Sequence, residues 1–125
     1  MKLSKLTDPQ FQATLRKLAG QEIPLRTAFA LKGIIKRVND ELNRYDEVRH
    51  EALEKLGERD ADGKIIVDER NNVKLSDENM NTLAAELNSL LNTDVDVGSV
   101  KLSDLGDKLS ITTNELIALD DLIIN

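Results

Sequence analysis

The stretch that decides the fold is Pro24–Gly57, with the sequence PLRTAFALKGIIKRVNDELNRYDEVRHEALEKLG. Its apolar side chains recur mainly at alternating steps of three and four residues, a spacing that lines one face of a long α-helix. Arg49 interrupts this seam, and Phe29, Ile34 and Val48 widen it as if toward a core. We therefore predict one helix over residues 24–57. The seam consists of Ala28, Leu31, Ile35, Val38, Leu42, Tyr45, Ala52 and Leu56.

The two ends of this stretch carry helix-boundary residues. Pro24 suits the first helical turn because its missing N–H would be unpaired there in any case. Gly57 suits a helix end because it adopts the left-handed conformation without strain. Such a helix is roughly 50 Å long at about 1.5 Å per residue. Two interpretations stay open: a bent core helix of one domain, or a helix whose seam another chain completes.

The composition of the chain excludes several classes of function. The chain has 125 residues, which predicts a single domain. It has three aromatic residues, too few for a nucleic-acid stacking platform, and no cysteine for disulfide or thiol chemistry. The first residues, MKLSKLTDPQFQ, lack the apolar core of a secretory signal, and no run of about 18 apolar residues predicts a membrane span.

The net charge of −6 is divided unevenly along the chain. Residues 1–37 contain eight Lys or Arg against two acidic residues, whereas residues 38–125 contain nine against 21. The acidic part repels phosphate, so we expect no nucleic-acid partner. The basic start of the long helix is the expected contact with a protein partner, and the candidate residues are Arg26, Lys32, Lys36 and Arg37.

The remaining segments predict an α+β fold that is mainly helical. The long central helix is accompanied by two or three shorter helices and a small antiparallel β-hairpin or sheet. Ser76 is the expected N-cap of one helix, and Thr112 with Glu115 forms the capping box of another. The predicted segments are a loose arm at 1–7, a short helix at 7–20, the hairpin at 58–75, a helix at 76–92, a strand region at 94–105 and a C-terminal helix at 112–124.

The segment after Gly57 also resembles a calcium loop. With Gly63 at the sharp turn, the carboxylates of Glu58, Asp60, Asp62 and Glu69 fall at ligand positions of an EF-hand. The first position is Glu instead of Asp, and the β-branched segment that follows is a poor second helix. The hairpin, with a strand over Lys64–Asp68 returning at Val73–Leu75, is therefore the preferred prediction over a calcium-binding module.

No catalytic pattern is present. His50 is the only histidine and lies off the seam, where a solvated surface residue is expected. The six glycines form no phosphate-binding loop. We therefore predict neither catalytic residues nor a cofactor, and expect the protein not to be an enzyme.

The order of parts resembles a known group of proteins. The segments are AFALKGIIKRVNDELNRYDEVRHEALEKLGERDADGK, then NSLLNTDVDV, then VKLSDLGDKLSITTNELIALDDLI. From Thr27 onward they are similar to small uncharacterised proteins encoded by tailed bacteriophages and prophages. The resemblance rests on heptads, turns and caps and transfers no site residue.

This resemblance implies a phage assembly factor or minor virion component, located in the cytoplasm of the bacterial host or in the virion. Such a protein would self-associate or bind other phage proteins. The alternative is a small acidic inhibitor or regulator of a host or phage protein.

Overall fold

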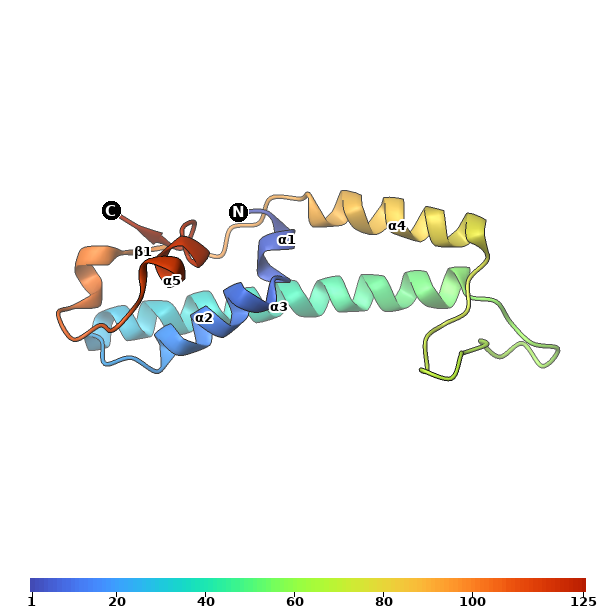
Figure 1. Cartoon of the computed structure of the whole chain (residues 1–125), viewed down its shortest axis with the longest axis horizontal. Helices are drawn as coiled ribbons and strands as arrows, with labels where there is room; N and C mark the ends of the chain where they lie inside the picture. The colour runs from blue at the N-terminus through green and yellow to red at the C-terminus, as the bar shows by residue number, and fades with distance from the viewer. The chain divides into compact units, whose positions relative to one another are not determined.

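The computed structural model describes all 125 residues (Figure 1). The chain forms two compact units: unit 1 comprises Met1–Leu42 and Asp94–Asn125, and unit 2 comprises Asn43–Thr93. The sequence predicted a single domain and gave no sign of this division. The elements are α1 (Leu3–Leu6), α2 (Pro9–Ala19), α3 (Leu25–Leu56), α4 (Asp77–Leu91), β1 (Val100–Lys101), the 3₁₀ helix η1 (Leu102–Leu105), α5 (Thr113–Ala118) and β2 (Ile123–Ile124).

The predicted mainly helical fold with a long central helix is confirmed, but the predicted direction of the sheet is wrong. β1 and β2 pair in parallel, with Val100 opposite Ile123 and Lys101 opposite Ile124. A parallel pair needs a long crossover connection, and here η1, α5 and their loops provide it. The alternation of valines in the predicted strand region at 94–105 indicated a strand without indicating its partner, and only two of those residues pair in the sheet.

The first turns of α3 provide the inner wall of unit 1. The buried line is Thr27, Leu31, Ile34 and Val38, so it begins one residue before the predicted seam. Thr27 can occupy a buried position because its Oγ1 donates a hydrogen bond to the carbonyl oxygen of Asp104, 2.7 Å away. Phe29, predicted to face the core, lies on the opposite side in solvent.

Residues from the N-terminal and C-terminal segments together form the core of unit 1. Its most enclosed side chains come from α1, α2, the segment after α4, η1 and the last residues. Each is less than 2 % exposed: Phe11, Leu6, Leu18, Leu105, Leu119, Leu122 and Val97.

The prediction of a loose arm at 1–7 is wrong. Leu3 and Leu6 lie three residues apart on the short helix α1 and are both buried. The Val95 amide donates to the Met1 carbonyl at 2.8 Å, and Lys2 pairs with Asp94 in an antiparallel bridge. The sequence pattern of two leucines was too short to reveal a helix that depends on these distant contacts.

The predicted C-terminal helix at 112–124 ends early. α5 stops at Ala118, and the chain turns through Leu119–Leu122 into β2. The Leu122 carbonyl accepts a 2.8 Å hydrogen bond from the Val100 amide. Pairing with β1 therefore satisfies a carbonyl that a helix ending at residue 124 would leave without an intrahelical partner.

The start of α5 is fixed to α2 by charge. The predicted capping box is present: the Glu115 amide donates to Thr112 Oγ1 at 3.2 Å, and the Thr112 amide donates to Glu115 Oε1 at 3.0 Å. Lys17 Nζ of α2 lies 2.7 Å from the same Oε1. The hydrogen bond from Lys17, followed by that from the Thr112 backbone, lowers the pKa of Glu115.

Unit 2 pairs the second part of α3 with α4 (Figure 1). Ser76 caps α4 as predicted, accepting a 3.2 Å hydrogen bond from the Asn79 amide. Asn79 Nδ2 in turn donates to the Leu56 carbonyl of α3 at 3.0 Å. No residue between 43 and 93 is buried, so the apolar side chains of both helices remain partly open to solvent.

The predicted hairpin at 58–75 is reduced to isolated antiparallel bridges, Arg59 with Ile65 and Val67 with Val73. The side chains of Asp60 and Asp68 stabilise two equivalent turns, which occupy much of the segment predicted to form strands. Each Oδ1 accepts the amides two and four residues later, at 2.8–3.0 Å. Gly63 and Asn71 occupy the left-handed position of the respective turns. Two such turns leave too few residues between them for longer strands.

We expect Leu119→Ala to lower the free energy of unfolding of unit 1 by about 2–5 kcal/mol, because it leaves a cavity in the core. Ile117→Ala, two residues earlier and 62 % exposed, should change it by less than about 1 kcal/mol. Urea titration followed by the NMR resonances of Phe11 measures both. Equal effects of the two substitutions would contradict the described core.

We expect Lys17→Met to raise the pKa of Glu115 toward its ordinary value, since the largest cause of the lowering is removed. Because the folded-state pKa is lowered, this contact stabilises unit 1 above the unfolded-state pKa, and the stabilisation is lost as pH falls through the folded-state pKa. NMR titration of the Glu115 carboxyl measures the change. Lys108→Met, which removes a separate 3.2 Å pair with Glu22, should leave the pKa of Glu115 unchanged.

Candidate interaction surface

The outer side of α3 in unit 1 carries two large apolar side chains in solvent. Leu25 is 86 % and Phe29 is 78 % exposed. Lys32 and Lys36 continue the same line at helical steps of three and four residues. We call Leu25, Phe29, Lys32 and Lys36 the α3 stripe. It joins an apolar end to a basic end on the side opposite the buried line.

A shallow apolar hollow lies beside the stripe. Its volume is about 230 Å³, and Lys32 is the only charged residue among those that line it. Side chains of α3 form one wall, and the end of α2 with the following linker forms the other. We call this hollow the α2–α3 groove, lined by Ala19, Ile23, Ala28, Leu31, Lys32 and Ile35.

Arg37 is positioned differently from the two lysines. Its Nη1 donates a 2.9 Å hydrogen bond to the Val97 carbonyl. A Cβ atom on Gly98 would lie 2.7 Å from that nitrogen, and Gly98 has a φ of 93°. Glycine therefore meets both the steric and the backbone requirement at this position. Arg37 joins α3 to the 97–98 segment within unit 1 and does not belong to the α3 stripe.

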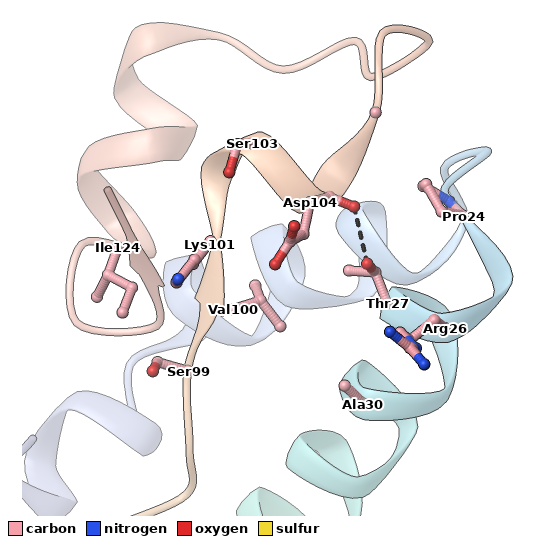
Figure 2. A pocket seen from close by; sticks show the side chains of 11 residues that line it. Pro24, Arg26, Thr27, Ala30, Ser99, Val100, Lys101, Ser103, Asp104 and Ile124 are labelled. Atoms are coloured by element: carbon pink, nitrogen blue, oxygen red, sulfur yellow. Dashed lines mark hydrogen bonds between the residues drawn. The ribbon is translucent and has the colours of Figure 1, made fainter.

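Arg26 lines a larger hollow of about 670 Å³ (Figure 2). Figure 2 shows Arg26, Thr27 and Ala30 on α3 and Lys101, Ser103 and Asp104 on the β1–η1 segment, with the hydrogen bond between Thr27 and Asp104 joining the two. The walls present two cations, one carboxylate and serine hydroxyls, a mixture suited to binding polar side chains of a partner. Its lining residues are Pro24, Arg26, Thr27, Ala30, Ser99, Val100, Lys101, Ser103, Asp104, Gly106 and Ile124.

The other residues that the sequence singled out belong to unit 2. Asp60 Oδ1 already accepts the amides of Asp62 and Lys64, and Glu58 pairs with Lys74 at 3.7 Å. The structure brings no three Asp, Glu or His side chains together in a group that could hold a metal ion.

His50 lies on the exposed surface of α3, with Nε2 3.4 Å from Glu54 Oε1 one turn later. None of the helices is both long enough and apolar enough to span a membrane.

Sequence reasoning located Lys32 and Lys36 but missed their apolar neighbours. The signal was available: residues 25, 29, 32 and 36 also repeat at steps of four, three and four. It was hidden because the predicted seam, at 28, 31, 35 and 38, has the same period and more apolar members. Only the packing of α2, β1 and η1 decides which line is covered.

One comparison with known proteins gives a match. The sequence model of a family described as "Protein of unknown function (DUF1617)" matches residues 10–103. This range includes the α3 stripe, the α2–α3 groove and all of unit 2. No curated protein and no solved structure matches the chain.

We expect Arg37→Ala to lower the free energy of unfolding of unit 1 by about 1 kcal/mol, because the Val97 carbonyl loses its charged donor. Lys36→Ala on the same helix should change it by less than about 0.5 kcal/mol. Urea unfolding followed at the resonances of Val97 compares the two. Equal destabilisation would show that the Arg37 contact makes no particular contribution.

Proposed function

Since this chain belongs to the DUF1617 family, whose description assigns no function, we propose its role from its surfaces. We propose a non-enzymatic interaction or structural protein, a phage-encoded assembly factor or minor virion component. It acts by oligomerising and by binding a protein partner, which the α3 stripe contacts.

The observation that carries this proposal is the exposure of Leu25 and Phe29 on one face of a rigid helix. Neighbouring large apolar side chains on a surface are typical of protein interfaces, and aromatic residues often supply much of the binding energy. Lys32 and Lys36 extend the same face, where charges select the partner and steer its approach. The partner therefore has an apolar centre with acidic side chains to one side.

The resemblance from Thr27 onward to proteins of tailed phages supports the phage assignment. The family match at residues 10–103 includes most of the same segments. The exposed stripe supports a binding role and is independent of that resemblance. The phage origin and the binding role of the protein can therefore be tested by separate experiments.

A second candidate, the acidic inhibitor or regulator, is favoured by the charge of α4. This helix carries Asp77, Glu78 and Glu86, all exposed, and no Lys or Arg. A helix with this charge matches a basic surface on a target protein. This candidate uses α4 where the first uses the α3 stripe, so substitutions separate the two.

The test places a photo-reactive amino acid at position 29 and irradiates cells that assemble particles. We expect a cross-link to one protein of the assembled particle or of an assembly intermediate. Lys32→Glu combined with Lys36→Glu should reduce this cross-link about tenfold or more, because both lysines then repel the acidic side chains. Lys64→Glu combined with Arg70→Glu is the matched control in unit 2 and should leave the yield unchanged.

The outcomes of this cross-linking experiment distinguish the two candidate functions. A probe at position 29 that labels nothing, while a probe at Asp77 labels a basic target protein, supports the inhibitor and contradicts the assembly role. A protein that is absent from particles and intermediates alike contradicts the role as an assembly factor or virion component.

A further inference from the structure

The helix pair of unit 2 is incompletely covered. Its apolar side chains line one face of each helix, with Arg49 interrupting the line on α3, yet none of them is buried. Two helices cannot enclose a core between them, whereas four helices can. The half-exposed residues are Tyr45, Ala52, Leu53 and Leu56 on α3 and Leu83, Leu87, Leu90 and Leu91 on α4.

An open groove of about 300 Å³ marks the uncovered side of this pair. Apolar side chains of both helices form its floor, and Val48 at the α3 edge is 47 % exposed. An apolar residue at this edge is expected when a further helix packs there. The groove is lined by Val48, Ala52, Glu86, Leu87, Ser89, Leu90 and Thr93.

The charges on either side of Val48 indicate which helix that is. Arg44 precedes Val48 by four residues and Glu51 follows it by three, so all three lie on one face of α3. In an antiparallel pair of α3 helices crossing at Val48, Arg44 of each copy lies opposite Glu51 of the other. A parallel pair instead places like charges next to each other. The face is thus complementary to itself in the antiparallel orientation alone.

We propose that unit 2 binds a second copy of this chain. The two helix pairs associate about a two-fold axis near Val48, with their α3 helices antiparallel, and together enclose a four-helix core. This inference rests on the proposed interaction role and deepens it by naming the occupant of the groove. It uses no residue of the α3 stripe.

The test measures the mass of the purified full-length chain by sedimentation equilibrium. The wild type is expected at twice the monomer mass. Arg44→Glu or Glu51→Arg alone should raise the dissociation constant about tenfold or more, because each places two like-charge contacts in the symmetric interface. Asp46→Arg, on the far side of α3 from Val48, is the matched control and should leave the mass unchanged.

Mixing the two single variants gives the decisive result. Glu at position 44 of one copy then faces Arg at position 51 of the other, and the second contact keeps its native residues. We expect the mixture to form heterodimers with nearly wild-type affinity. Circular dichroism confirms that each variant is folded, which both exposed positions should permit.

A wild type that remains monomeric at millimolar concentration overturns the inference. So does a dimer whose stability neither single variant changes, or a mixture that restores nothing. A monomer that still cross-links through position 29 overturns only the self-association. A dimer without that cross-link overturns only the partner binding.

Discussion

The fold depends on one constraint: the chain encloses a single core, and it places that core along the first turns of α3. Thr27, Leu31, Ile34 and Val38 form the inner line, and Phe11, Leu105 and Leu119 close over it from other elements. Beyond Leu42 the same helix continues without a buried residue. Burial of apolar surface is the main stabilising term in folding, so unit 1 carries most of the stability.

This uneven distribution of buried residues explains which elements could be predicted from the sequence. The bounds of α3 and α4 were predictable because Pro24 and Ser76 are local signals that act within a few residues. Gly57 follows the end of α3 as expected, but the left-handed conformation predicted for it is wrong. Glycine is needed there because a Cβ atom would lie 2.7 Å from Val73 Cγ1. The Thr112–Glu115 capping box was predictable because it too is a local signal. α1 and the parallel β1–β2 pair were not, because two buried leucines and two two-residue strands form only through contacts distant in sequence.

The candidate surface shows the same limit. Periodicity identified α3 as amphipathic, but two lines of equal period run along it, and only tertiary packing determines which is covered. Phe29 was therefore assigned to the core although it lies in solvent. The basic cluster at the start of α3 was recognisable from charge alone. Arg37 does not belong to the exposed cluster, because it donates a hydrogen bond to the Val97 carbonyl that no local sequence pattern predicts.

Unit 1 consists of two segments separated by the whole of unit 2, and this arrangement orders the events of synthesis. A ribosome releases residues 1–42 first, then the 51 residues of unit 2, and only then the segment with Leu105, Leu119 and Leu122. Until that last segment emerges, Phe11 and Leu18 have no complete cover. The nascent chain thus exposes apolar surface during most of its translation, when such surface is prone to aggregation.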